Sequence, residues 1–303
     1  MDFGGCWLLL DDDRLLEATV PGRIRGRRKA LGNAAVVGDR IRFALESGRA
    51  VVQDVESRRN AFSRRDAGRA PIEQVVAANL DQVVLVAALV EPEFKPGFAD
   101  RVLCQAEHAG IPARLALNKA DLGADADARG LLDDYARAGY EGTSVSAKTG
   151  EGVESLLNTC RGHRTLFVGH SGVGKSSLLN AMVPGLDLLA GRVNLKTGKG
   201  RHTTTAAWLL RPEPGLELID TPGLRAFGLW GIGPDDLEQA YPEFRPFLGR
   251  CRFGDCRHDR EPGCALQEAT RSGAVSGLRF ASFLKLREEL VQERLLEALR
   301  GAR

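Results

Sequence analysis

The 303-residue chain lacks any apolar run long enough to cross a membrane as a helix, which takes roughly 20 consecutive apolar residues. Its first residues, MDFGGCWLLLDDD, lack the basic start of a secretory signal peptide, and their apolar stretch is too short for one. We therefore expect a cytoplasmic protein without a membrane partner. In that compartment we expect the six cysteines to be free or metal-bound and not paired in disulfides.

The chain also lacks a strong net charge, an internal repeat and a low-complexity tract. Its formal charge is +2 and 43% of its residues are hydrophobic, which is ordinary for a globular protein. At roughly 150 residues per domain the length favours two or three domains. Basic residues are concentrated near the N-terminus, where residues 23–29 read RIRGRRK and further arginines follow: Arg58, Arg59, Arg64, Arg65 and Arg69. These residues are a candidate nucleic-acid surface, although a solvated loop and strand edge would explain them equally well.

The periodicity of apolar residues divides the chain into three parts. Short alternating runs separated by Gly, Asn and Asp fill residues 1–70, which indicates an all-β domain whose size fits a small Greek-key barrel of the OB type. From about Gln74, continuous apolar strands alternate with helical segments, as in a parallel sheet with crossover helices. Residues 231–303 lack this alternation and end in a helix with apolar positions at Phe283, Leu286, Leu290, Val291, Leu295 and Leu299.

A phosphate-binding loop lies between a predicted strand and a predicted helix. Residues 169–176, GHSGVGKS, match the pattern G-x-x-x-x-G-K-[ST] in the correct strand–loop–helix context. Backbone N–H groups of such a loop surround the β-phosphate at a helix N-terminus. Lys175 is expected to bridge the β- and γ-phosphates, and Ser176 to bind Mg²⁺. The predicted phosphate-binding residues are Gly169, His170, Ser171, Gly172, Val173, Gly174, Lys175, Ser176 and Ser177.

The segment NKAD, residues 118–121, predicts that the base is guanine. It ends a predicted strand, where α/β sheets bind their ligands. The carboxylate of Asp121 can accept hydrogen bonds from N1–H and the 2-amino group of guanine, and adenine offers neither donor there. Asn118 and Lys119 belong to the same element, and Ser146, Ala147 and Lys148 fit the loop whose backbone N–H meets the guanine O6 atom. We therefore predict GTP as the bound nucleotide.

Two further segments complete the predicted site. In DTPG, residues 220–223, Asp220 is expected to hold Mg²⁺ through water and the N–H of Gly223 to contact the γ-phosphate. In GRHTTT, residues 200–205, either Thr204 or Thr205 is expected to complete the Mg²⁺ shell.

The base-reading element precedes the phosphate loop, the reverse of the order in ordinary small GTPases. A sheet domain tolerates such a circular permutation when its original ends lie close together, since every site element stays at the carboxyl end of its strand. The DTPG segment then leads within about ten residues into the C-terminal part. Through that connection, a nucleotide-dependent change in the DTPG segment would reach the C-terminal part, as in a conformational switch.

A cysteine and histidine cluster follows in the C-terminal part. Cys251, Cys256, His258 and Cys264 read C-x₄-C-x-H-x₅-C. Four such ligands suit one tetrahedral Zn²⁺ in a closed structural site, and reduced cysteines beside a loop histidine are the alternative. We expect such an ion to support folding.

The order NKAD, SAK, GHSGVGKSSLLN, GRHTTT and DTPG, with β-rich sequence before it and the Cys/His cluster after it, resembles the circularly permuted ribosome-assembly GTPases of the RsgA (YjeQ) family. The resemblance covers nearly the whole chain. It implies an OB barrel over 1–70, a permuted G domain over 71–230 and a zinc-binding helical domain over 231–303. It also implies a GTP hydrolase that binds the small (30S) ribosomal subunit and its rRNA, assists late maturation and is stimulated by the subunit. A monomer is expected.

The residue that orients the attacking water is not the usual one. Many GTPases place a glutamine directly after the DxxG glycine, where this chain has Leu224. Either hydrolysis is slow or another group acts, and His202 is the candidate, because a near-neutral imidazole can hold a water in line. A histidine that contacts a partner or solvent is the alternative.

Two other functions remain compatible with the sequence. One is a nucleotide-gated RNA-binding or scaffold protein in which hydrolysis is incidental. The other is a GTPase whose partner is a protein unconnected with the ribosome.

Overall fold

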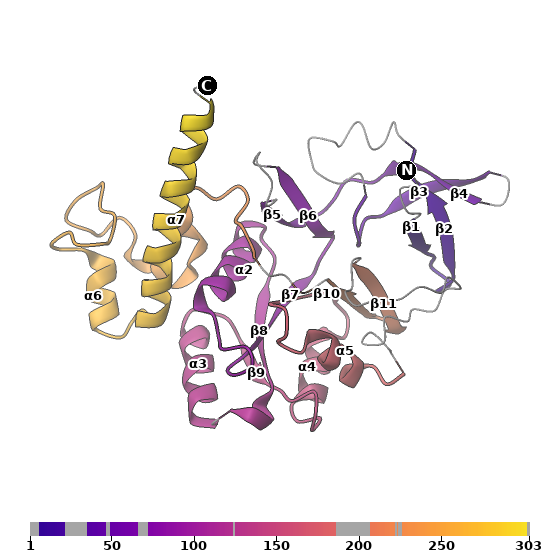
Figure 1. The fold of residues 1–303 in the computed structure, drawn as a ribbon, viewed down its shortest axis with the longest axis horizontal. Helices are drawn as coiled ribbons and strands as arrows, with labels where there is room; N and C mark the ends of the chain where they lie inside the picture. The colour runs from indigo at the N-terminus through magenta and orange to yellow at the C-terminus, as the bar shows by residue number, and fades with distance from the viewer. Residues whose placement is uncertain are drawn as a thin grey trace.

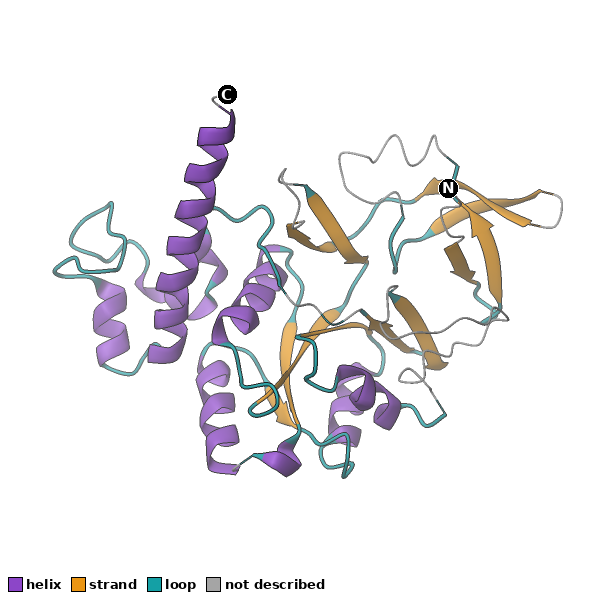
Figure 2. Ribbon diagram, viewed as in Figure 1, coloured by secondary structure: helices purple, strands orange, loops and turns teal. Residues whose placement is uncertain are grey.

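The computed structural model describes residues 6–21, 35–46, 49–65, 72–123, 125–185, 207–221, 223 and 226–301. Strands gather toward one end of the molecule and helices toward the other (Figures 1 and 2). The two parts meet at a central sheet. Within the described part of the chain, no helix has both the length and the apolar character needed to cross a membrane.

The N-terminal part is built from strands, as predicted. A four-stranded sheet in the order β1-β2-β4-β3 contains β1 (Cys6–Leu9), β2 (Leu15–Thr19), β3 (Ile41–Glu46) and β4 (Arg49–Val55). Strands β2 and β4 are parallel, and the other neighbours are antiparallel. A separate antiparallel hairpin, β5 (Ala61–Arg65) with β6 (Glu73–Ala78), follows. Among the described strands, no pairing joins the sheet and the hairpin into a closed barrel.

The central sheet has the order β11-β12-β10-β7-β8-β9. Its strands are β7 (Gln82–Ala88), β8 (Ala113–Asn118), β9 (Gly142–Ser144), β10 (Arg164–Gly169), β11 (Trp208–Glu213) and β12 (Leu216–Asp220). All neighbours are parallel except the edge strand β11. Every residue of β7 is buried, which explains its continuous apolar sequence, because helices cover both faces of the sheet.

The helices of this part divide between the two faces of the sheet. They are α2 (Pro96–His108), α3 (Asp125–Arg137), α4 (Val153–Cys160) and α5 (Lys175–Met182), with a short 3-10 helix, η2 (Ala120–Leu122). Alternate residues of β7 point to opposite faces: Val83 and Leu85 pack with α2 and α3, whereas Val84 and Val86 pack with α4 and α5. The alternation of strand and helix therefore predicted this layer structure correctly.

The C-terminal part is helical. It contains the 3-10 helices η3 (Leu237–Ala240) and η4 (Pro242–Phe247), then α6 (Ala265–Arg271) and the long helix α7 (Gly277–Gly301). Helix α7 packs against α2 of the central part, and Phe283, Leu286 and Leu290 are buried in the C-terminal core. The remaining predicted apolar positions are exposed, with Leu295 60% and Leu299 59% accessible.

A buried ion cluster joins the C-terminal part to α2. The guanidinium of Arg279 pairs with Asp100 of α2 and, at 2.7 Å, with Glu243 of η4. Its carbon lies 4.5 Å from the ring centre of Tyr241 and 5.2 Å from that of Tyr135. Arg279 and Asp100 are inaccessible to solvent. An arginine is suited to this place because its planar guanidinium both pairs with carboxylates and stacks on aromatic rings.

Replacing Arg279 by methionine (R279M) should destabilise the fold by about 3–5 kcal/mol, because it leaves two buried carboxylates without a counter-charge. Urea unfolding followed by circular dichroism measures the loss. R245M is the matched control, since Arg245 pairs with Glu107 near the surface and should cost at most about 1 kcal/mol. Equal losses in the two variants would contradict the assignment of Arg279.

Candidate nucleotide and metal sites

The phosphate loop connects the end of β10 to the start of α5, as the sequence predicted. Gly174 has a φ angle of +86°, and a Cβ atom at this position would lie 2.5 Å from Nδ2 of Asn118. Glycine is therefore required both by the backbone conformation and by the close approach. The loop ends at the N-terminus of α5, where the first backbone N–H groups have no hydrogen-bond acceptor within the helix.

The side chain of Asn118 joins the base-reading element to the phosphate loop. It lies at the end of β8 and is only 2% exposed. Its Nδ2 atom donates to the carbonyl of Val173 at 3.0 Å, and its Oδ1 atom accepts from the backbone N–H of Ala147 at 3.1 Å. Three segments that are far apart in the sequence therefore meet at one side chain.

Asp121 is prepared to accept hydrogen bonds from a ligand. The hydroxyl of Ser146 donates to its Oδ1 atom at 2.7 Å, and the Lys148 ammonium lies 3.6 Å from Oδ2. The hydrogen bond from Ser146 is the main cause that lowers the pKa of Asp121 below its usual value. The carboxylate stays ionised at neutral pH. We assigned Ser146 to the loop around guanine O6, and the structure adds this contact with Asp121.

Lys119 adopts a left-handed backbone conformation, with a φ angle of +64°. Its ammonium donates to the carbonyl of Glu91, in the loop between β7 and α2. Sequence reasoning did not connect that loop with the site, because no motif marks it.

Lys175 and Asp220 form a buried ion pair at the centre of the predicted phosphate and magnesium site. The two side chains are 6% and 0% exposed. The second carboxylate oxygen of Asp220 is buried and has no hydrogen-bond partner among the described residues. An unpartnered buried carboxylate oxygen suits a water or cation, so Asp220 fits the part predicted for it beside Mg²⁺. Beside it, the hydroxyl of Thr221 donates to the carbonyl of Phe167 at 2.9 Å and fixes the strand end.

Gly223 approaches the phosphate loop directly. A Cβ atom at this position would lie 3.1 Å from Cα of Ser171, a tight contact. A larger residue here would therefore require the phosphate loop or Gly223 to shift by a few tenths of an ångström. The predicted His202, Thr204 and Thr205, and also Leu224, lie outside the described residues.

The predicted metal ligands come together in the C-terminal part. One ligand atom each from Cys251, Cys256, His258 and Cys264 lies within 4.8 Å of the others. Nδ1 of His258 is 3.3 Å from Sγ of Cys264 and 3.5 Å from Sγ of Cys251. Such separations fit the edges of a tetrahedron whose metal–ligand bonds are about 2.0–2.3 Å long.

Glu238 orients the histidine of this cluster. Its Oε2 atom lies 2.8 Å from Nε2 of His258, so the ring presents Nδ1 to the three sulfurs. Burial alone would lower the pKa of His258, but the hydrogen bond to Glu238 and the cysteines raise it to about 9. The pKa of the Cys251 thiol lies below its usual value. Burial by itself would raise this pKa, but the hydrogen bond from the Ala265 backbone N–H and other neighbours lower it by more. Burial raises the pKa of the Cys256 thiol to about 12. The four residues fit a closed metal site in which the bound ion displaces the protons of the imidazole and the thiols.

The described arginines of the predicted basic surface are engaged within the protein. Arg58 pairs with Asp39 at 2.7 Å, and Arg59 pairs with Asp81 at 2.5 Å. Arg65 pairs with glutamates of α7. Residues 23–29 and Arg69 lie outside the described residues.

Asn118→Ala should weaken GDP binding about tenfold or more, because each buried hydrogen bond it removes contributes about 1 kcal/mol. Isothermal titration calorimetry with GDP measures the effect. Asn158→Ala is the control, since Asn158 is exposed on α4, away from the site. Unchanged GDP affinity in a folded N118A variant would contradict the role of this side chain.

The sequence matches the RsgA GTPase family over residues 55–230. It is 42% identical over 293 residues to the small ribosomal subunit biogenesis GTPase RsgA of Gemmatimonas aurantiaca, covering 95% of each chain. It is 46% identical over 255 residues to the protein of that name from Azotobacter vinelandii, covering 82% of this chain and 73% of the relative.

Solved structures agree with this match. YjeQ from Thermotoga maritima superposes with a TM-score of 0.72 at 31% identity, over 93% of this chain and 92% of YjeQ. YloQ, described as a circularly permuted GTPase, has the same fold with a TM-score of 0.67 at 24% identity, over 96% of this chain and 92% of YloQ. The chain, with its predicted base-reading segment ahead of its phosphate loop, is a member of the RsgA GTPase family.

Proposed function

We propose that this GTPase binds the small (30S) ribosomal subunit and assists its late assembly, with turnover that the subunit accelerates. The observation that carries the proposal is the similarity, along 95% of both chains, to a relative named for biogenesis of that subunit. The arrangement of Asn118, Asp121 and the phosphate loop supports the chemistry, because all three lie at the same edge of the sheet.

Different residues select the base, hold the phosphates and bind the magnesium ion. Asp121, held by Ser146, selects guanine, while the glycine-rich loop and Lys175 hold the phosphates. Mg²⁺, held by Ser176, Asp220 and either Thr204 or Thr205, would neutralise charge that develops on the β- and γ-phosphates. When GTP arrives, Lys175 exchanges its contact with Asp220 for the phosphates. Water then attacks the γ-phosphate, and GDP and inorganic phosphate are the products.

His202 is our proposed residue for orienting the attacking water. The position after Gly223 is Leu224, whose side chain has no polar atom, so the water needs another partner. A site that lacks the usual glutamine turns over slowly by itself. Acceleration by the ribosomal subunit is expected if the subunit positions His202 against the attacking water.

The other parts of the chain would serve the same partner. We propose that residues 1–70 form an OB-type domain that contacts rRNA, that residues 71–230 form the G domain, and that residues 231–303 form a zinc-stabilised helical domain. Such a protein works in the cytoplasm as a monomer. The scaffold alternative, with incidental hydrolysis, predicts no acceleration by the subunit.

Adding purified 30S subunits should raise the GTP turnover of the wild-type chain at least tenfold, because the partner completes the catalytic site. Phosphate release at saturating GTP measures this increase in turnover.

His202→Ala should keep its affinity for GDP and lose most of the stimulated rate. Asp121→Asn should prefer xanthosine over guanosine nucleotides, which checks that the observed turnover belongs to this site. Turnover that ignores 30S subunits would contradict the proposal.

Removing a metal ligand should unfold the C-terminal part before the rest, since a structural zinc contributes directly to folding. Elemental analysis should find one zinc per wild-type chain and much less in Cys256→Ser, which should also melt at a lower temperature. Cys6→Ser is the control, since Cys6 lies on β1 in the N-terminal sheet. Equal zinc content in the two variants would contradict the site.

A further inference from the structure

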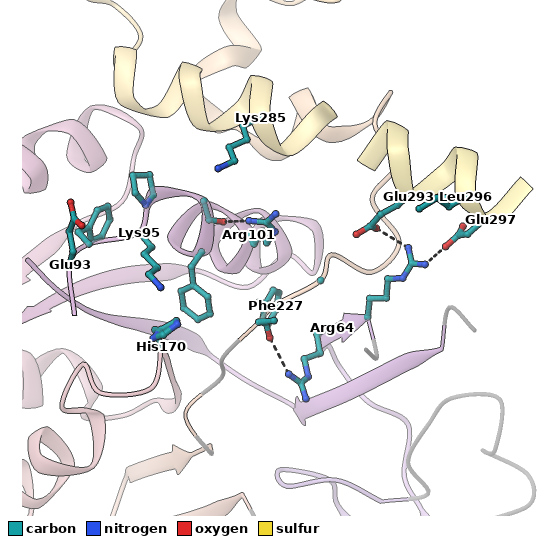
Figure 3. Close-up of a pocket in the computed structure, with 17 residues that line it drawn as sticks. Arg64, Glu93, Lys95, Arg101, His170, Phe227, Lys285, Glu293, Leu296 and Glu297 are labelled. Carbon is teal, nitrogen blue, oxygen red and sulfur yellow. Dashed lines mark hydrogen bonds and ion pairs between the residues drawn. The ribbon is translucent and has the colours of Figure 1, made fainter. Parts of the chain in front are cut away.

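Three parts of the molecule meet beside the nucleotide site around a cavity of about 820 Å³. Its walls come from the N-terminal hairpin, the start of α2, the segment 226–228 and helix α7. Figure 3 shows Arg64 reaching toward the segment of Phe227 on one side, and Glu293 and Glu297 projecting from α7 on the other. His170 of the phosphate loop also lines the cavity.

The N-terminal hairpin anchors the chain just after the DTPG segment. The backbone N–H of Arg65 donates to the carbonyl of Gly228 at 2.9 Å, in an isolated antiparallel bridge. Nη1 of Arg64 donates to the carbonyl of Ala226 at 3.3 Å. A Cβ atom on Gly228 would lie 3.0 Å from Cβ of Arg65, so the bridge requires close approach.

This anchor lies very close to the phosphate loop along the chain. Ala226 follows Gly223 by three residues, which span at most about 10–11 Å when extended. Gly223 itself lies against Ser171. The anchored carbonyl of Ala226 therefore lies within about 11 Å of Gly223 along the chain, so a shift of the anchor acts close to the phosphate loop.

The same arginine connects the anchor to the C-terminal helix. The guanidinium of Arg65 pairs with Glu293 at 2.9 Å and with Glu297, one turn further along α7. Arg65 is 23% exposed and the glutamates 45% and 35%. All three residues line the cavity, so ion pairs connect α7 to the hairpin there.

We propose that Arg65 is a positioning residue for GTP hydrolysis, which holds residues 226–228 in place and couples their position to helix α7 through Glu293 and Glu297. The inference rests on the proposed role of Gly223 at the γ-phosphate. A partner that moves α7 or the hairpin then changes the rate of GTP hydrolysis without touching the nucleotide.

The test removes and then reverses the charges of these ion pairs in the 303-residue chain and measures GTP hydrolysis. The variant E293Q/E297Q should lower kcat for GTP about fivefold, at the low end of typical coupling between sites. Its affinity for GDP should not change, because GDP lacks the γ-phosphate. Arg65→Glu should have a larger effect, R65E/E293R/E297R should restore most of kcat, and Arg65→Lys should retain part of it.

Two controls separate this role from a structural one. Arg294→Gln removes another ion pair of α7, with Asp235, which is not part of the hairpin, and should leave kcat unchanged. Melting temperatures should stay within a few degrees across the glutamate variants. Wild-type kcat in both E293Q/E297Q and R65E would overturn the inference. A wild-type chain that fails to hydrolyse GTP would instead contradict the proposed function.

Discussion

The hydrogen bonds of one amide hold the predicted nucleotide site together. Asn118 reaches from the end of β8 to the carbonyl of Val173 in the phosphate loop, and it accepts from the backbone of Ala147 on the other side. Buried polar atoms of this kind are stable only when each is paired. The base-reading segments and the phosphate loop are thus fixed relative to each other before any ligand arrives, which reduces the cost of binding.

These hydrogen bonds join segments that meet in space, so a reversed order along the chain leaves the predicted site intact. The edge of a parallel sheet is defined by where strands end, and β7, β8, β10 and β12 lie side by side whatever their order along the chain. What the permutation changes is the sequence that follows β12, where residues 226–228 lie beside the N-terminal hairpin and precede the C-terminal part. The contacts of Arg65 with α7 and of Arg279 with Asp100 of α2 join that part to the hairpin and to the central sheet domain that carries the predicted site.

The sequence predicted the local parts well and the long-range contacts poorly. The strands, the phosphate loop and the four residues of the Cys/His cluster carry motifs or periodicities that act over a few residues. Arg65 appeared only as a member of a basic stretch, and its glutamate partners follow 228 and 232 residues later. Arg279 carried no signal at all, because a buried arginine and an exposed one look alike in a sequence. The exposed Leu295 and Leu299 continue the apolar pattern of α7 past the end of its core.

An experimental structure of the chain with Mg²⁺ and a non-hydrolysable GTP analogue tests the central claim most directly. We expect the guanine edge at the carboxylate of Asp121 and the triphosphate along residues 169–176 of the same molecule, with the amide of Asn118 between them. A base bound elsewhere, with the phosphates alone in the loop, would contradict the account.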